Sequence, residues 1–205
     1  DVYKRQIISW EGKLRPSLEY TGIYPRVENG ELPIWIATGG TPESSLRAGA
    51  FGLPITYAII GGNPRRFARN IEIYKSIALS YGHDPSKLPI GVHSWGYVAE
   101  TDEQAKREFF PSLKAHQDII GKERGWPAFD ENAFEREIGS HGAIYLGSPE
   151  TVAQKIIDTI ETLGINRFMI HTPVGSMPHE YVMNSIRLFG ERVKPIVDKL
   201  SLIHI

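Results

Sequence analysis

Apolar residues along the chain follow two patterns that alternate from one segment to the next. In the first pattern, short apolar runs lack polar alternation, which is typical of strands buried on both faces. Four runs predict such strands: 34–37, 55–60, 90–99 and 167–172. In the second pattern, apolar residues recur every three or four positions, as at Phe67, Ile71 and Tyr74, and this spacing predicts the apolar face of a helix.

The predicted helices follow the strands, and most of them begin at a capping residue followed by proline, as at Thr41-Pro42 and Ser148-Pro149. We expect helices from Thr41 to about Gly52, Asn63 to Gly82, Thr101 onward, Ser148 to Gly164 and Pro178 onward. The apolar face expected on the last helix consists of Val182, Ile186, Phe189, Val193 and Ile196.

Two polar segments interrupt the alternation of strands and helices. Residues 7–31 are rich in glycine and proline and predict a loop that leads to the first strand, and residues 126–147 predict an irregular insertion. Strands separated by amphipathic helices indicate a parallel sheet and an α/β fold. This order fits an open doubly wound sheet or a TIM (β/α)8 barrel, of which four strands are half.

Composition narrows the class of protein without indicating an activity. The chain has 205 residues, of which 41% are hydrophobic and 23% charged, as in one soluble globular domain. A net charge of -1 gives no sign of nucleic-acid binding or of a polybasic membrane surface, and no apolar run is long enough to span a bilayer. The absence of cysteine excludes disulfides, thiolate metal sites and a cysteine nucleophile. We expect a cytoplasmic protein.

The two ends of the chain encode one inverted repeat. Residues 1–6 (DVYKRQ) can be back-translated as GAT GTG TAT AAG AGA CAG, and the reverse complement of that string translates as LSLIHI, the sequence of residues 200–205. The string resembles a transposon-end tag used to fragment DNA for sequencing. We therefore expect residues 1–6 and 200–205 to be translated tag and residues 7–199 to be natural sequence. Sequencing the parent locus tests this expectation.

The segment Thr38–Ser45 is the best candidate for a ligand-binding loop, because it joins the end of a strand to the start of a helix. Gly39 and Gly40 would let a phosphate approach the backbone closely, and the Thr41 hydroxyl and the helix dipole would favour the anion. A tight turn with an N-cap explains the same residues equally well.

Other turns repeat parts of this arrangement. Gly61 and Gly62 follow the second predicted strand, and residues 172–176 follow the last one, where many barrels bind phosphate. An ordinary structural turn is the stronger alternative at both places. Residues 147–150 do not follow a predicted strand, so we interpret them as a plain N-cap.

The histidines are dispersed and form no set with metal-ligand spacing. His93 and His171 lie in predicted strands, so either side chain could face a substrate pocket at the mouth of a barrel, although a histidine in the core or wall is the more common case. The chain has no G-x-S-x-G nucleophile elbow, no G-x-G-x-x-G motif and no P-loop. The sequence therefore identifies no catalytic residue and no metal ligand.

Three segments carry a resemblance to one known family. Residues 32–44 (LPIWIATGGTPES) resemble the P-I-W-I-A-x-G-G-[ST]-P-E-S segment of bacterial-luciferase-like monooxygenases. Residues 98–105 (VAETDEQA) and 147–156 (GSPETVAQKI) are similar to two later segments of that class, in the same order. Tyr24-Pro25-Arg26 adds to the likeness, which covers essentially all of 7–199. One subgroup, the flavin-dependent oxidoreductases of this class, looks most similar through residues 58–62 and 91–94.

The resemblance implies the C-terminal part of a TIM barrel that binds reduced FMN or, in some relatives, the deazaflavin F420. The implied reaction is monooxygenation of a small organic substrate by molecular oxygen, with reduced flavin supplied by a separate reductase. In that family, the loop that matches Gly39, Gly40 and Thr41 lies at the flavin phosphate, and we extend this role to Gly61 and Gly62. Relatives are often homodimers. The alternatives are a non-catalytic flavin-binding relative and an unrelated phosphate-binding barrel such as an aldolase.

Length is where the chain departs from the family. The first four or so strands of the barrel have no counterpart, and half a barrel leaves an open strand edge and exposed apolar helix faces. We therefore expect the isolated 205-residue product to be insoluble, or to bind FMN weakly or not at all.

Overall fold

The computed structural model describes residues 7–22, 24–25 and 32–201. The chain divides into two compact units, 1–35 and 36–205, and each is described by itself. The predicted tags at 1–6 and 202–205 lie outside the described residues, as does Arg26. The backbone of residues 200 and 201 continues the last helix.

The smaller unit contains a β-hairpin where the sequence predicted a loop. Strand β1 (Ile7–Trp10) pairs antiparallel with β2 (Leu18–Gly22), so the prediction of a loop over 7–31 is wrong for these residues. The hairpin buries little: Ile7 is 64% exposed and Tyr20 is 86% exposed. The two strands are held mainly by backbone pairing, and the Tyr20 N–H also donates to Ser9 Oγ at 3.2 Å. Because the strands bury so little, they carry no apolar pattern that predicts them.

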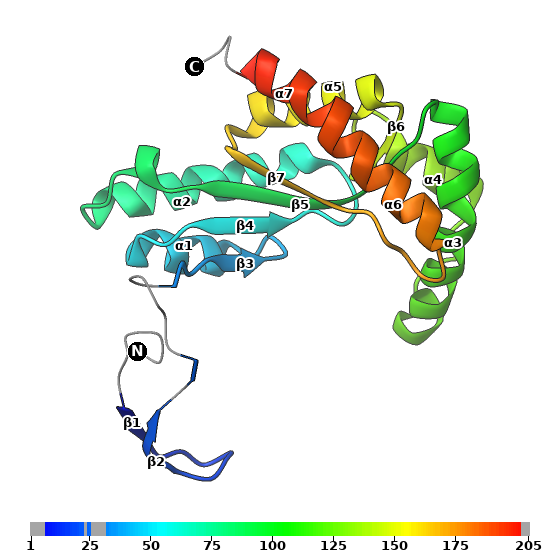
Figure 1. The fold of residues 1–205 in the computed structure, drawn as a ribbon. Helices are drawn as coiled ribbons and strands as arrows, with labels where there is room; N and C mark the ends of the chain where they lie inside the picture. Colours follow the sequence, from blue (N-terminus) through cyan, green and yellow to red (C-terminus); the bar gives the residue numbers. More distant parts are fainter. Residues whose placement is uncertain (1–6, 23, 26–31, 202–205) are drawn as a thin grey trace. The chain divides into compact units, whose positions relative to one another are not determined.

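Four of the five parallel strands in the sheet of the larger unit correspond to the predicted strands (Figure 1). They are β3 (Ile36–Thr38), β4 (Ile55–Ala58), β5 (Ile90–Val98) and β7 (Arg167–His171). Each of the four pairs with the next along this series, without reversal, and the fifth strand, β6 (Tyr145–Gly147), pairs with the carboxyl end of β5. A doubly wound sheet reverses its strand order at a switch point, whereas a barrel does not. The order therefore favours the barrel.

The helices lie between the strands as predicted. They are α1 (Pro42–Phe51), α2 (Ala68–Ser80, preceded by the 3-10 turn η1, Pro64–Phe67), α3 (Asp102–Arg124), α5 (Pro149–Leu163) and α6 (His179–Leu188). A further 3-10 turn, η2, spans Pro85–Lys87. The side chains of Asn63, Thr101 and Ser148 accept hydrogen bonds at the helix starts, which confirms three of the predicted caps. Among the described helices, none is long and apolar enough to cross a membrane.

The predicted irregular insertion at 126–147 contains regular structure, so that prediction is wrong. Helix α4 (Glu131–Ile138) begins where Asp130 accepts a 2.7 Å hydrogen bond from the Ala133 N–H, and strand β6 (Tyr145–Gly147) pairs with the carboxyl end of β5. The glycines and proline of this segment favoured the prediction of a loop. The short helix is stabilised by contacts with residues distant in sequence. Lys155 on α5 donates to the carbonyls of Ile138 and Gly139 at the end of α4.

The last predicted helix is continuous, but the set of residues that faces the core shifts part of the way along it. A π-helical turn, η3 (Phe189–Val193), joins α6 to α7 (Lys194–Ser201). The predicted apolar face fails at Ile186, which is 53% exposed, while Ser185 is buried and its Oγ accepts the Val98 N–H at 2.9 Å. The extra residue of the π turn brings Val193 back into the core.

The core fills the space between the sheet and the helices. Ile55 and Tyr57 of β4 and Ile90 and Val92 of β5 are almost fully buried among residues of α1 and α2. Side chains alternate between the two faces of a strand, so the residues between these point to the opposite face. That opposite face carries the candidate chemistry.

Candidate functional site

The register of the parallel strands brings five side chains together on the face of the sheet opposite the core. Ala58, His93 and Met169 lie side by side across three strands, and Trp95 lies beside His171. All five are partly exposed, in contrast to the buried residues that alternate with them on β4 and β5. We call these five residues the inner face, because in a barrel the equivalent positions point inward in layers.

Aromatic contacts hold the two histidines of the inner face. The ring centroids of His93 and His171 are 5.3 Å apart, and the Trp95 ring lies 4.3 Å from His171 and 5.8 Å from His116 on α3. Burial, and after it the neighbouring His171, lowers the pKa of His93 below its usual value of 6.5. His93 is therefore a neutral imidazole at pH 7, able to accept a proton or a hydrogen bond. A role for His93 and His171 in a substrate pocket stays a prediction.

The loop after β3 has a backbone that only glycine adopts easily. Gly40 has a φ of 108°, and a Cβ at this position would meet the Phe67 ring at 2.7 Å. The Gly40 N–H donates to Thr38 Oγ1 at 3.1 Å, and its carbonyl accepts from Asn70 Nδ2 at 2.6 Å. Gly39 is different, because a Cβ there would meet nothing within 4 Å. The loop is thus fixed at Gly40 and open at Gly39.

Polar side chains gather where this loop enters α1. Thr41 is the N-cap residue, but its hydroxyl makes no capping bond and instead lies 2.8 Å from Ser44 Oγ. Arg47 Nη2 lies 3.5 Å from the same Ser44 oxygen. Gly39, Gly40, Thr41, Ser44 and Arg47 together form what we call the α1 cradle. Arg47 was missed in the sequence, although its position three residues after Ser44 places both on one helix face.

The second glycine turn differs from the α1 cradle in one decisive respect. The Gly62 N–H donates to both carboxylate oxygens of Glu137 on α4, at 3.1 Å each, and the Ala143 N–H donates to the same carboxylate. The Glu137 carboxylate therefore occupies the Gly62 N–H, which was predicted to bind the phosphate. Gly61 is open, because a Cβ there would meet nothing within 4 Å, and its predicted role stays untested.

The remaining turns serve the packing of the chain. In the turn after β7, Thr172 and Val174 are buried, and Gly175 has a φ of 54° and lies close to the Ser112 carbonyl on α3. At the start of α5, Ser148 accepts from the Thr151 N–H at 3.3 Å, as predicted for an N-cap, but strand β6 ends at Gly147, so the prediction that no strand precedes this turn is wrong. Within the described ranges, no three histidine, aspartate or glutamate side chains form a group that could hold a metal ion.

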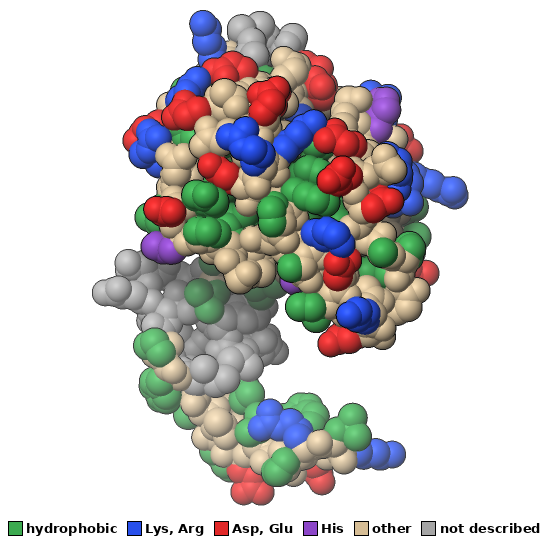
Figure 2. All heavy atoms as spheres, turned by 90° about the vertical axis from the view of Figure 1, so that its right-hand side faces the viewer, with side chains coloured by type: hydrophobic (Ala, Val, Ile, Leu, Met, Phe, Trp, Pro, Cys, Tyr) green, Lys and Arg blue, Asp and Glu red, His purple; other side chains and the backbone are tan. Residues whose placement is uncertain are grey.

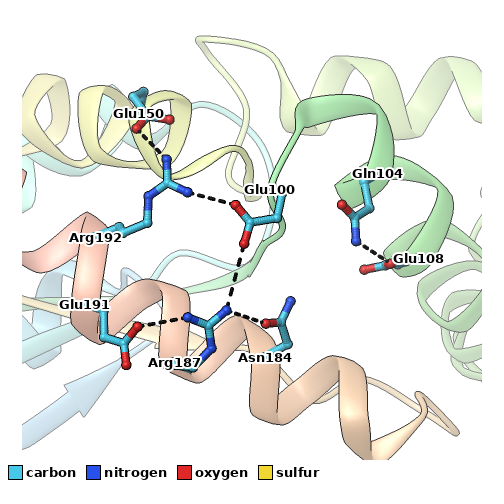
Figure 3. A network of polar contacts seen from close by, with 8 residues as sticks. All are labelled: Glu100, Gln104, Glu108, Glu150, Asn184, Arg187, Glu191 and Arg192. Atoms are coloured by element: carbon cyan, nitrogen blue, oxygen red, sulfur yellow. Dashed lines mark hydrogen bonds and ion pairs between the residues drawn. The ribbon is translucent and has the colours of Figure 1, made fainter.

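An ion-pair network fixes the elements behind the carboxyl end of β5 (Figure 3). Arg192 bridges Glu100 at 2.8 Å and Glu150 at 3.0 Å, and Arg187 contacts Glu100 at 3.8 Å and Glu191 at 2.8 Å. The pKa of Glu150 is lowered by a hydrogen bond from its own backbone N–H and then by Arg192. These side chains are about half exposed, so the network contributes little to stability and mainly orients α5 and α6.

A cavity of about 490 Å³ opens beside the inner face, at Trp95. Its lining is mainly aromatic and aliphatic, with a few polar side chains from α3 and α4. On the side of the larger unit seen in Figure 2, acidic and basic side chains are interspersed, and hydrophobic side chains are exposed between them. That face therefore shows no extended patch of one charge sign.

Comparison with known proteins gives one family and a consistent fold. The luciferase-like monooxygenase family matches residues 2–167. The alkanal monooxygenase alpha chain of Aliivibrio fischeri is 24% identical over 200 residues, which cover 85% of this chain and 54% of that protein. The chain thus spans about half the length of the curated relative it matches.

Two solved structures show the same architecture. The oxygenating constituent of 3,6-diketocamphane monooxygenase from Pseudomonas putida, in complex with FMN, is 19% identical, with a TM-score of 0.67 over 95% of this chain and 59% of its own. An F420-dependent secondary alcohol dehydrogenase is 17% identical, with a TM-score of 0.63 over 96% of this chain and 58% of its own. These likenesses confirm the expected partial TIM barrel.

Proposed function

Since the chain belongs to the luciferase-like monooxygenase family, we propose that it is part of a flavin-dependent oxidoreductase that oxidises a small organic substrate with reduced FMN and molecular oxygen. The observation that carries this proposal is the α1 cradle. It offers an open glycine, two hydroxyls, a guanidinium and a helix N-terminus at one turn. These groups are the ones that bind a phosphate in other α/β proteins.

The cradle suits the phosphate of FMN on the grounds of shape and charge. A phosphate needs close approach to the backbone, and the empty space at Gly39 permits it. Arg47 supplies a positive charge beside the hydroxyls of Thr41 and Ser44, at the N-terminus of α1, where the helix dipole also favours an anion. Gly62 supports this choice of site by contrast, because Glu137 already holds its N–H and would repel a second anion.

The inner face supplies the second part of the site. Reduced flavin, when bound, activates oxygen, a reaction that protein side chains do not perform. His93, Trp95 and His171 form a partly buried aromatic wall that would exclude water and orient an organic substrate. Neutral His93 would accept a hydrogen bond from a substrate hydroxyl or hydrate without carrying a charge into that wall.

F420 is the alternative cofactor, and a matched structure, the secondary alcohol dehydrogenase, contains an F420-acetone adduct. FMN and the deazaflavin F420 both carry a phosphate on the ribityl side chain, so the cradle suits either. A non-catalytic flavin-binding protein would use the cradle as well. Oxygen consumption that depends on added substrate, measured on the protein encoded by the whole reading frame, separates an oxygenase from these two alternatives. A separate reductase as electron source and a homodimeric state also belong to this proposal.

The proposal is tested by comparing FMN with riboflavin, which lacks the phosphate, in equilibrium dialysis against the 205-residue chain. We expect FMN to bind on the order of tenfold more tightly than riboflavin, because the phosphate gains charge-assisted hydrogen bonds. Arg47→Gln should remove most of that difference, whereas Arg107→Gln, an equal change of charge on α3, should leave it intact. Equal binding of the two flavins by the unmodified chain contradicts the proposal.

A further inference from the structure

The 490 Å³ cavity beside Trp95 is walled by flat aromatic surfaces. Trp95 on β5, Trp126 after α3 and Phe129 before α4 supply three rings from three different elements. Trp126 remains 47% exposed, although it is among the largest apolar side chains of the unit. The cavity is large enough for a bicyclic compound, and exposed aromatic walls are typical of sites that bind a planar apolar group.

The cavity has one cationic group, Arg124, at the end of α3. Its guanidinium lies 5.2 Å from the centre of the Trp126 ring, in a cation–π contact. In the described part of the chain, Arg124 forms no ion pair with a carboxylate. A guanidinium stacked on an aromatic ring keeps its N–H donors at the edge, where they can bind a carboxylate with two parallel hydrogen bonds.

The cavity has one acidic group, Glu137, on a different wall. Its carboxylate is fixed against the turn at Gly62 and the N–H of Ala143. Because this carboxylate repels an anion at its own wall, an acidic ligand is directed toward Arg124. The cavity thus has a positive charge on one wall and a negative charge on another. A pocket for a neutral hydrocarbon has no use for such charges.

We propose that this cavity binds an aromatic carboxylic acid, with the ring between Trp95 and Trp126 and the carboxylate on Arg124. The part of the ligand remote from the acid then lies near Trp95, which contacts His171 on the inner face at 4.3 Å. The substrate class rests on the proposed function, whereas binding of the acid does not require flavin. Arg124 is a specificity-determining residue and takes no part in the reaction itself.

The test measures binding of 2-naphthoate and of its neutral counterpart 2-naphthylmethanol, without flavin, by the shifts of the tryptophan indole N–H resonances. We expect both compounds to shift the Trp95 and Trp126 signals and to leave that of Trp10 on the hairpin unchanged. Naphthoate should bind on the order of tenfold more tightly, the usual gain from a charge-assisted pair. Arg124→Gln should abolish the preference for the acid, and Lys122→Gln, two residues away outside the lining, should retain it.

Each other outcome overturns a defined part of the proposal. Equal binding of acid and alcohol by the unmodified chain overturns the substrate class, and shifts at neither Trp95 nor Trp126 overturn the site. A preference for the acid that survives in Arg124→Gln overturns the role of Arg124. Since flavin is absent, failure here leaves the comparison of FMN with riboflavin unaffected, and failure of that comparison leaves this result unaffected.

Discussion

At the scale of single residues, adjacent glycines in the α1 cradle have different structural duties. Gly40 combines a φ of 108° with close contact to Phe67, while Gly39 borders open space. The sequence pattern predicted a special role for the pair but could not distinguish the two glycines. The difference between them depends on the ring of Phe67, which lies just before the next helix. Asn70 reaches the loop in the same way, from α2, whereas the spacing of Arg47 from Ser44 on α1 was a signal in the sequence that the prediction did not use.

The different duties of the two glycines make a matched prediction. We expect Gly40→Ala to lower the free energy of unfolding by about 1–3 kcal/mol, because alanine at positive φ is strained and its methyl meets Phe67. Gly39→Ala should change the free energy by no more than about 0.5 kcal/mol. Urea unfolding of both variants measures this difference, and equal losses would show that the described loop geometry is wrong.

His93 gives a prediction about pH at the same scale. Its pKa is lowered in the folded chain, so between that value and 6.5 the unfolded chain binds more protons than the folded chain does. Stability must therefore fall as the pH falls below about 6.5 through this window. We expect His93→Gln to lose less stability than the unmodified chain between pH 7 and pH 5 in urea unfolding. A steeper loss in the variant than in the unmodified chain contradicts the assigned direction.

At the scale of elements, the sequence predicted what local patterns encode. Four of the five strands of the sheet, the main helices and the caps at Asn63, Thr101 and Ser148 follow from apolar periodicity and capping chemistry, and the structure confirms them. The hairpin β1–β2 and helix α4 were missed because neither depends on a long apolar pattern. Backbone pairing defines the hairpin, and Lys155 and Glu137 tie α4 to the rest of the unit.

Lys155 therefore has a measurable effect on α4. Its ammonium donates to the carbonyls of Ile138, Gly139 and Ile144, and burial lowers its pKa from 10.5 to about 8, against the opposing effect of Glu137. We expect Lys155→Met to destabilise the chain by about 1–3 kcal/mol, because buried carbonyls lose their donor. Lys122→Met, on the exposed face of α3, is the control. Equal urea midpoints for the two variants would refute this role.

Lys155 also makes the stability of the chain depend on pH. Burial lowers the pKa of Lys155 to about 8 in the folded chain, whereas in the unfolded chain the pKa keeps its ordinary value of 10.5. Between these values the unfolded chain binds more protons, so this lysine makes stability rise with pH in that window. The unmodified chain should therefore gain stability relative to Lys155→Met between pH 8 and pH 10, as measured by the difference of their urea midpoints.

At the scale of the whole molecule, the described sheet has five strands, of which β3, β4, β5 and β7 pair in the order of a barrel, and the chain matches 54% of its curated relative. In the described part, β3 pairs only with β4 and β7 only with β5, so both outer edges offer unpaired backbone groups. The cradle lies on this unit, but a flavin ring would contact one side of the site alone. Family membership could be predicted from three sequence segments, whereas the substrate could not.

This incompleteness predicts that the 205-residue chain binds FMN only weakly. The cradle contributes the phosphate contacts, while much of the ring stays in water and adds little affinity. Equilibrium dialysis should give a dissociation constant well above the micromolar range. Tight binding of one FMN per chain would contradict the incomplete barrel.

Binding of the FMN phosphate by the α1 cradle is tested most directly by NMR. The ¹⁵N-labelled chain is titrated with FMN and with riboflavin, and the amide resonance of each residue is monitored. We expect FMN to shift the amides of Gly39, Gly40 and Thr41 and to leave that of Gly62 unchanged, since Glu137 holds it. Riboflavin should leave the three cradle amides in place. Shifts at Gly62 instead of the cradle, or equal cradle shifts with riboflavin, would show that the α1 cradle does not bind the phosphate.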